Sequence, residues 1–577
     1  MAFFYGAGIS IKSGLPAGFQ LKSTLVGGCT AVNRDIDSVC RTALPLEDIL
    51  DNFSVYTNID PLLRIFENGK PNATHILLAH LIDSGFVNDV CTTNFDCLVE
   101  KSLHACGPID FNLLTSDQYN KNPTIPTIFK LHGTISDRKS MMLRIRDVAR
   151  KKRNKLTIDA LNHIFSTGPH DVVLVMGYSC SDHFDINPII RNMSGPRKTI
   201  LYLKHCEKGS DTPQILNLET PFEGYDGSSL VVNTDTFMSD LLNGLMPHIK
   251  DPVRLKKSLL VAKTDRPDLN LWKARVEEWK TQVSGPNAYR ANLIMGAFLY
   301  TLSKYKLADK YYSLIPKETR NTSIIALSYS KRSTCLYNVG TSEGLRKASL
   351  FASRSLRLLP ETKELIHMRN KDEIALNAAA MAHHREVYIH LEGADDEMKT
   401  GSKEKEIAHL EMAKNHLDEA LSLFKVLQQH PGLIGCNLLD GRLHQHMASL
   451  VEDPTSNQLK MALDAYRRAS RIALDHGDVD GEAASLNGIG NVYYSMRRFK
   501  KARNSHERAL TIYEKLDRKR EIAIVLMHLA DDYKSESSIL PLSFRLCASL
   551  LLKEISDRRL NRDNSQKMNS LKESLYL

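Results

Sequence analysis

The stretch Tyr5–Pro16 reads YGAGISIKSGLP and follows a short apolar run at residues 2–4. The apolar run predicts a β-strand, and a helical pattern begins near Phe19. A strand that turns through Gly-x-Gly into a helix can bring backbone N–H groups against a pyrophosphate. Glycine suits this turn because a Cβ would block both the turn and the close approach of a phosphate. Many strand–turn–helix corners without a ligand also contain two glycines, so later parts of the chain must decide.

Three later strands end in polar corners of the same kind. Residues 1–246 alternate β-rich runs with helical patterns, which predicts a parallel sheet with helices on both faces. The three strands, each with the polar residues that follow it, are Val87–Cys91 with TTNFD at 92–96, Thr127–Leu131 with HGT at 132–134, and Val172–Met176 with GYS at 177–179. Further strands are expected at Thr199–Leu203 and Leu230–Val232, and helices at Leu46–Val55, Asn72–Ser84 and Cys97–Leu103. Because ligands bind at the carboxyl ends of parallel strands, the four corners predict one shared site.

The second half of the chain is helical throughout. Residues 247–290 are charged and punctuated by prolines, which predicts a linker with one helix. Residues 291–577 lack β-rich runs and show internal similarity, clearest in Glu482–Leu516. There Gly490, Ala502 and Ala509 alternate with large residues, as in a tetratricopeptide unit. We therefore expect a solenoid whose concave surface binds a protein or peptide.

Composition sets the broad class of the protein. A chain of 577 residues is expected to form two to four domains. No apolar run approaches the ~18–20 residues of a membrane span, so no membrane association is expected. Ten cysteines without a Cys-x-x-Cys pair favour reduced thiols in a cytoplasmic protein and argue against a zinc ribbon. The net charge of +9 permits contact with nucleic acid without requiring it.

Taken together, the four corners resemble the sirtuin-like superfamily. The matching residues, which cover roughly residues 1–246, are Gly6–Ser10 with Ser13–Pro16, Thr93–Asp96, His132–Gly133 and Gly177–Ser179. The likeness is greatest to the branch fused to sensor or repeat domains in prokaryotic anti-phage systems, whose members hydrolyse NAD. The resemblance implies a Rossmann-like α/β domain at 1–246, followed here by the all-α tetratricopeptide-like region.

Two departures separate the chain from the sirtuin deacetylases. Those enzymes carry a four-cysteine zinc module, whereas the segment Asp137–His170 contains no cysteine. They also have Asp-Phe-Arg where this chain has Ala17-Gly18-Phe19. No metal is therefore expected. Because of the second departure, the resemblance does not predict which residues form the nicotinamide pocket. Cys180, with Asp182, His183 and Asp185, does not complete a tetrahedral metal site.

The corner residues can be given roles in cleaving NAD to ADP-ribose and nicotinamide. His132 is the candidate base because imidazole titrates near neutral pH. Asn94 can hold a ribose hydroxyl or the attacking water, and Asp96 can bind the ribose or orient its neighbours. The expected binding residues are the backbone of Gly6, Ala7, Gly8 and Ile9 for the pyrophosphate, the Ser10 hydroxyl, Thr93 from the second corner, and, by the resemblance, Gly177 and Ser179 for the adenosine ribose, with Asp182 as a further contact.

Structural roles stay open for the same residues. Asn94 and Asp96 are of the types that cap helices and could cap the helix expected from Cys97. Thr93 and Ser179 could also be caps, and His132 could be a structural residue at a strand end. Two other functions also stay open, an NAD-dependent protein deacylase and a non-catalytic scaffold that binds a nucleotide. The basic run Arg144–Lys155 is more typical of a solvated helix than of a nucleic-acid site.

The combined expectation is a regulated cytoplasmic effector. The resemblance implies that the first domain hydrolyses NAD and that the helical repeats sense a trigger, bind a partner or assemble a homo-oligomer. The product, linear or cyclic ADP-ribose, stays open. Related domains carry a helix before the first strand. Two expectations stay open: that the natural start lies upstream of Met1, or that a neighbouring subunit covers the face where that helix would pack.

Overall fold

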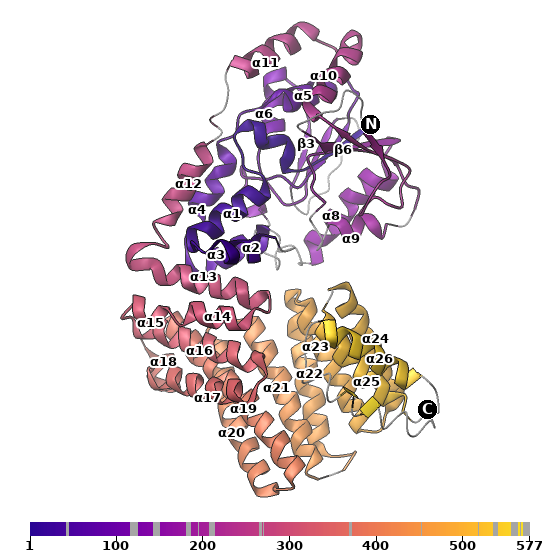
Figure 1. The fold of residues 1–577 in the computed structure, drawn as a ribbon. Helices are drawn as coiled ribbons and strands as arrows, with labels where there is room; N and C mark the ends of the chain where they lie inside the picture. Colours follow the sequence, from indigo (N-terminus) through magenta and orange to yellow (C-terminus); the bar gives the residue numbers. More distant parts are fainter. Residues whose placement is uncertain are drawn as a thin grey trace. The chain divides into compact units, whose positions relative to one another are not determined.

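The computed structural model describes residues 1–577 except 42–45, 116–124, 142–150, 181–185, 194, 207–213, 265–267, 269, 369–371, 452, 517, 535–539, 555–563, 566 and 569–577. The chain divides into two compact units, Met1–Phe298 and Leu299–Leu577. Each unit is considered by itself (Figure 1).

The first unit is built on one sheet. Within its described residues, eight strands follow the order β3-β4-β2-β1-β5-β6-β8-β7. Their bounds are β1 Ala2–Tyr5, β2 Asp89–Thr92, β3 Asn112–Leu114, β4 Thr127–Lys130, β5 Val172–Met176, β6 Thr199–His205, β7 Gln214–Leu216 and β8 Gly227–Val232. All neighbours pair in parallel except β7 and β8, which are antiparallel. The predicted α/β class and its largely parallel sheet are confirmed. The short strands β3 and β7 were missed by the sequence analysis.

The order of the strands reverses at the centre of the sheet. Strand β1 pairs with β2 on one side and with β5 on the other. The chain builds outward through β2, β4 and β3 in one direction and through β5, β6 and β8 in the other. In open α/β sheets the crevice outside such a reversal, at the carboxyl ends of the strands, binds ligands. The turns that follow β1 and β5 lie at this point.

Helices cover both faces of the sheet. Successive residues of a strand point to opposite faces, so they contribute to two separate core clusters. Phe3 and Tyr5 belong to one core cluster, with side chains of α5 (Ala73–Asp83), α6 (Leu98–Cys106), α10 (Thr234–Leu245) and α11 (Pro252–Thr264). Ala2 and Phe4 belong to the other cluster, with side chains of α8 (Lys151–Asn162), η4 (His163–Thr167) and α9 (Ile186–Arg191). Both faces of the sheet are therefore buried.

Residues 247–290 belong to the first unit. Where the structure describes this segment, it contains not one complete helix but two, α11 and α12 (Leu271–Lys280), with η5 (Met246–His248) and η6 (Gly285–Asn287) beside them. Trp279 is fully buried, its Nε1 donates to Thr57 Oγ1 at 3.0 Å, and its ring meets Phe53 edge-on at 4.7 Å. The remaining elements of the unit are η1 Ala7–Ser13, α1 Gly18–Cys29, α2 Asn33–Cys40, α3 Leu46–Tyr56, α4 Asp60–Leu63, η2 Arg64–Glu67 and η3 Arg138–Ser140.

The second unit is a stack of paired helices. Its helices are α13 Ala288–Thr301 (which spans the division), α14 Tyr305–Tyr312, α15 Ile315–Glu318, α16 Thr322–Val339, α17 Ser342–Arg357, α18 Thr362–His367, α19 Glu373–Thr400, α20 Lys403–Val426, α21 His430–Ser449, α22 Asn457–His476, α23 Val479–Ser495, α24 Phe499–Lys515, α25 Lys519–Asp532 and α26 Leu540–Glu554. Sequential helices pack as hairpins, as expected for tetratricopeptide-like repeats. Small residues allow the close packing: a Cβ on Gly488 or Gly441 would lie 2.3 or 2.6 Å from the Tyr466 ring.

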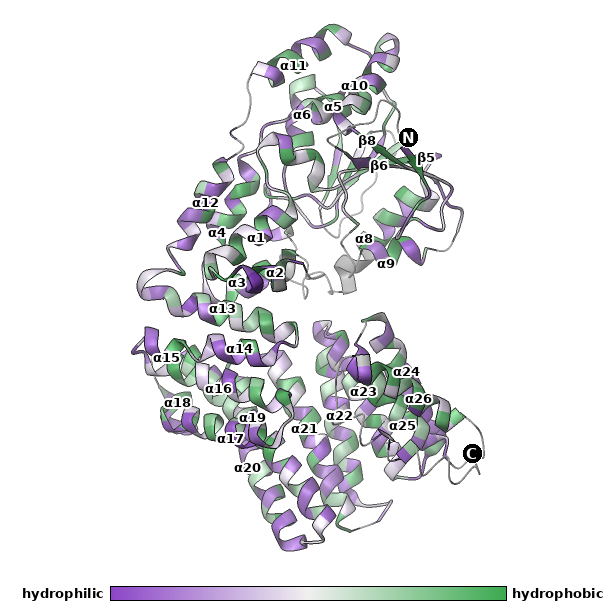
Figure 2. Cartoon of the chain, in the orientation of Figure 1, coloured by the Kyte–Doolittle hydropathy of each residue, from purple (hydrophilic) through white to green (hydrophobic). Residues whose placement is uncertain are grey.

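The hydropathy of the elements agrees with this architecture (Figure 2). Strand β5 is largely green, whereas the helices of the second unit carry both colours along their lengths. Among the helices that the structure describes, none is long and apolar enough to span a membrane.

Four histidines face one another between α19 and α20. His383 and His390 lie seven residues apart on α19, as do His409 and His416 on α20, so each pair shares a helix face. The Nδ1 atoms of His383 and His416 are 2.9 Å apart, and those of His390 and His409 are 3.1 Å apart. Burial lowers the pKa of His383, His390 and His416 to about 4. These three rings are therefore neutral in the folded protein at neutral pH.

Acidification is expected to destabilise the second unit through these rings. An imidazole in the unfolded chain takes up a proton below its ordinary pKa of ~6.5, whereas the three rings in the folded chain stay neutral until about pH 4. Their stabilisation is complete above pH 6.5 and is lost as the pH falls towards 4. At pH 5 each ring should cost about 1 kcal/mol of unfolding free energy, allowing for partial exposure. Urea denaturation at pH 7 and pH 5 measures the loss, and a triple His→Gln variant should reduce it. An equal loss in that variant would contradict this account.

Candidate active site

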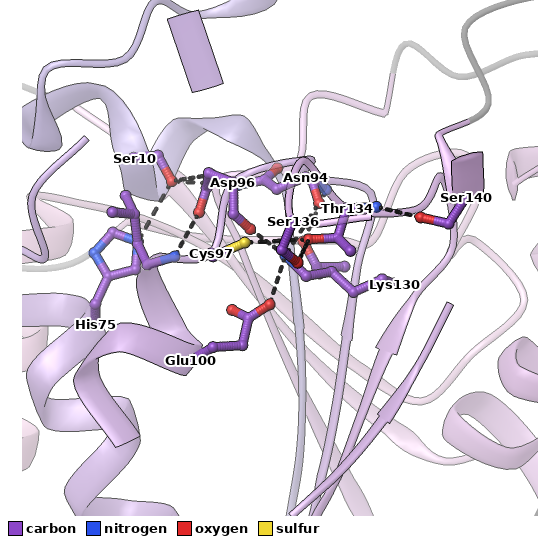
Figure 3. Close-up of polar contacts among 12 residues, drawn as sticks. Ser10, His75, Asn94, Asp96, Cys97, Glu100, Lys130, Thr134, Ser136 and Ser140 are labelled. Carbon is purple, nitrogen blue, oxygen red and sulfur yellow. Dashed lines mark hydrogen bonds and ion pairs between the residues drawn. The ribbon is translucent and has the colours of Figure 1, made fainter. Parts of the chain in front are cut away.

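Polar side chains from two corners meet beyond the carboxyl ends of β1 and β2 (Figure 3). Ser10 Oγ donates to Asp96 Oδ2 at 2.9 Å. Asn94 Nδ2 donates to the same carboxylate oxygen at 3.1 Å and to Ser10 Oγ at 3.3 Å. All three residues are at most 6% exposed. The first and second corners therefore form a single hydrogen-bonded network of a hydroxyl, an amide and a carboxylate.

The helix-cap interpretation also holds for Asp96. Its second carboxylate oxygen, Oδ1, accepts from the backbone N–H of Leu98, the first residue of α6. Asn94 does not contact α6 in this way, and its own backbone N–H donates to Thr92 Oγ1 at 3.0 Å. Asp96 thus joins the start of a helix to the network at the sheet edge. Thr93, half-buried, lies between Thr92 and Asn94.

His75 borders the network and was not predicted to do so. Its Nε2 lies 3.4 Å from Ser10 Oγ, and its Nδ1 lies 2.9 Å from Asn72 Oδ1. Asn72 caps α5 and donates to the carbonyl of Ile9 at 2.7 Å. Burial lowers the pKa of His75 to about 4, so its ring is neutral at pH 7. His75 and Asn72 therefore fix the turn that carries Ser10.

Lys130 and Glu100 lie beneath the second corner and were missed entirely. Lys130 ends β4, and its Nζ is 3.0 Å from Glu100 Oε1 on α6. Nζ also donates to the backbone carbonyl of Asp96 and lies 3.5 Å from that of Asn94. A lysine inside a buried strand run was a signal that the sequence did offer, because buried lysines are almost always paired.

His132 lies on the loop after β4, beside the second corner. It is 5% exposed, and its ring centroid is 6.4 Å from that of Phe95, which stands between Asn94 and Asp96. The two loops are joined by backbone, since Ile135 N–H donates to the Phe95 carbonyl at 2.8 Å. The third predicted corner therefore adjoins the second.

The glycine turns after β1 and β5 pack directly on each other. A Cβ on Gly6 or Gly8 would lie 2.7 or 2.6 Å from the backbone of Gly177. The N–H groups of Gly6, Gly8 and Ile9 donate to the carbonyls of Met176, Gly177 and Gly6. These glycines are thus required by the packing of two turns. Of the four N–H groups assigned to the pyrophosphate, three donate within the chain. The fourth belongs to Ala7, which is exposed and is the first residue of η1, where an N–H group has no acceptor within the helix.

The fourth corner places Gly177 at the centre of this packing and Ser179 on the surface. Asp182 lies outside the described residues, as do His183 and Asp185. The basic run from Arg144 is described only from Lys151, where α8 begins. Among the described residues, no group of three or more His, Cys, Asp or Glu side chains has the arrangement of a metal site.

Family models match two parts of the chain. The SIR2-like domain model matches residues 88–205, and a tetratricopeptide repeat model matches residues 455–534. The first match includes the corners after β2, β4 and β5. No curated protein matches the chain significantly.

The similar solved structures are distant. A Rap protein in complex with competence and sporulation factor is 12% identical, with a TM-score of 0.33, and the match covers 58% of this chain and 97% of that one. A complex of the TPR2AB domain of yeast Sti1 with pHSP90 is 13% identical, with a TM-score of 0.19, over 50% and 99% of the two chains. A signal transduction ATPase with a tetratricopeptide repeat sensor from Pyrococcus horikoshii is 12% identical, with a TM-score of 0.30, over 98% and 82%.

Proposed function

Because the chain joins a SIR2-like domain to tetratricopeptide repeats, we propose that its first unit hydrolyses NAD to ADP-ribose and nicotinamide. The observation that carries the proposal is the network of Ser10, Asn94 and Asp96. It gathers a hydroxyl, an amide and a carboxylate at the carboxyl edge of the sheet, beside the reversal in strand order. Such groups suit ribose hydroxyls, which both donate and accept hydrogen bonds.

The reaction does not require a strong general acid from the protein. The bond between ribose C1′ and the nicotinamide nitrogen breaks, and its electron pair neutralises the positive ring. A bond from C1′ to a water oxygen forms through an oxocarbenium-like transition state. The water must lose one proton, which His132 takes in this proposal. Asn94 holds the ribose hydroxyl or the attacking water.

The rest of the substrate lies along the same edge in this proposal. Ala7 offers its N–H towards the pyrophosphate, and the Ser10 hydroxyl turns from Asp96 Oδ2 to donate to it when the substrate binds. Gly177 and Ser179 border the adenosine ribose. Thr93 lies in the second corner, between Thr92 and Asn94. No step in this scheme requires a metal.

The second unit is proposed to control the first. An uncontrolled NAD hydrolase would deplete the NAD of its own cell, so activity should depend on a trigger, a protein partner or assembly into a homo-oligomer. Tetratricopeptide repeats suit this role because stacked helical hairpins present extended binding surfaces. The resemblance to repeat-fused effectors supports a role in anti-phage defence through NAD depletion.

Product analysis tests the proposal. The purified full chain is incubated with NAD over a range of protein concentrations, with and without an acylated peptide, and the products are separated by chromatography. Nicotinamide and ADP-ribose should appear in equal amounts without the peptide, and turnover per chain should rise with protein concentration. Nicotinamide release only with the peptide would indicate a deacylase. Unchanged NAD in every sample and in expressing cells would indicate a scaffold.

A further inference from the structure

Lys130 is buried to a degree that is unusual for its type. The four residues of β4 are all buried, and Lys130 is 1% exposed. Lysine is almost never found fully buried unless its charge is paired. Its position is two residues before His132 and below the loop that carries Asn94 and Asp96. The proposed cleavage reaction assigns no role to Lys130.

The contacts of the Lys130 ammonium explain how it can be buried. The ammonium donates to the backbone carbonyls of Asn94 and Asp96, and Glu100 Oε1 lies 3.0 Å away as its ion-pair partner (Figure 3). The two carbonyls flank Phe95 in the loop between β2 and α6. One side chain therefore holds that loop at two points.

Stability alone is a weak reason to keep such a pair. The side chains of Lys130 and Glu100 are 0% and 8% exposed, so both charges have lost most of their hydration. Buried ion pairs often contribute no more stability than apolar residues of similar size, because desolvation offsets the attraction. What this pair provides is geometry, since the same loop places the amide of Asn94 3.3 Å from Ser10 Oγ and 3.1 Å from Asp96.

We propose that Lys130 is a positioning residue, whose ammonium holds the Asn94–Asp96 loop so that its side chains meet Ser10 in the geometry required for NAD cleavage. This role rests on the proposed function. Lys130 acts on the backbone of the loop and does not itself touch the substrate. Glu100 neutralises it from the first turn of α6.

The test uses a pair of substitutions that remove both charges together. Lys130→Met alone leaves Glu100 buried without its partner, which can unfold the protein. Lys130→Met/Glu100→Gln avoids that outcome and keeps the shape of both side chains. We expect this double variant to stay folded, with an unfolding temperature only slightly below that of the wild type because two backbone carbonyls lose their donor. Its kcat for NAD should be at least tenfold lower, with KM changed less than threefold. Lys250→Met/Asp83→Asn removes an ion pair of 2.9 Å elsewhere in the unit, exposed on its lysine side, and should leave kcat unchanged.

A second measurement separates this role from the proposed function. Hydrogen exchange of the amides at residues 93–98 should be faster in the Lys130→Met/Glu100→Gln variant, with little change elsewhere in the sheet. This readout does not need NAD turnover. If the wild type cleaves no NAD, the proposed function fails while the exchange still tests the positioning. Unchanged exchange in this loop, or wild-type kcat in the double variant, would overturn the role of Lys130.

Discussion

Replacing either Asn94 or His132 by alanine is expected to lower NAD turnover by about 10²- to 10⁴-fold, the range for loss of a positioned catalytic group. Asn94→Ala removes the amide that bridges Ser10 and Asp96, but the direct bond of 2.9 Å between those two residues remains. Loss of this amide should cost about 1 kcal/mol, small against a total stability of ~5–15 kcal/mol. Turnover by nicotinamide release and unfolding temperature are measured together. Activity should collapse while the fold persists.

The strand β2 supplies a matched control. Asn88 is exposed at the amino end of β2, whereas Asn94 follows its carboxyl end, so Asn88→Ala makes the same chemical change at the opposite edge of the sheet. We expect Asn88→Ala to keep wild-type turnover. If Asn94→Ala and His132→Ala were as active as Asn88→Ala, these corners would not be catalytic. That result would favour the alternative of a non-catalytic scaffold that binds a nucleotide.

The fold could be predicted where one strong pattern covered a whole element. The apolar run Val172–Met176 lies between Asp171 and Gly177 and corresponds to β5 in full. Strands β3 and β7 have three residues each, and most of their residues are not buried, so neither carries a clear apolar period. The two helices in 247–290 were underestimated because prolines and charge suggested a linker. Trp272 and Trp279, seven residues apart on one helix face, were the signal that this segment packs.

The candidate site could be predicted only as far as strand ends allow. Parallel strands bring their carboxyl ends to one edge, so the meeting of Ser10 with Asn94 and Asp96 followed from the strand assignments. The contacts of His75 and Lys130 did not follow, because they depend on how α5 and α6 pack against the edge. Helix packing sets these distances, and no local spacing encodes them.

The structure gives Gly6 and Gly8 a packing role that the sequence analysis did not consider. The sequence analysis explained Gly6 and Gly8 by the approach of a phosphate. In the structure their hydrogen atoms face the backbone of Gly177, so a side chain is excluded even without a ligand. The proposed approach of a phosphate would exclude a side chain at the same positions, so sequence alone cannot separate the two explanations.

Gly177→Ala is therefore expected to destabilise the first unit by about 3 kcal/mol or more. Gly177 has φ of +66°, which an L-residue adopts only with strain. In addition, its new Cβ would lie 2.6 Å from Ile9 N and 3.1 Å from Gly6 O, and these backbone atoms belong to two buried residues. The turn that carries Ser10 must shift to make room, so NAD turnover should fall as well. Urea denaturation and nicotinamide release measure the two effects.

Gly85→Ala separates strain from packing in the same unit. Gly85 also has a positive φ, +78°, but a Cβ there would meet nothing within 4 Å. Its alanine variant should lose only the cost of the left-handed conformation, about 1 kcal/mol, and keep full turnover. The difference between the two variants then measures how tightly the turns after β1 and β5 are packed. Equal losses would mean that the two turns have room to separate, and the Gly-x-Gly corner would again need a ligand to explain its glycines.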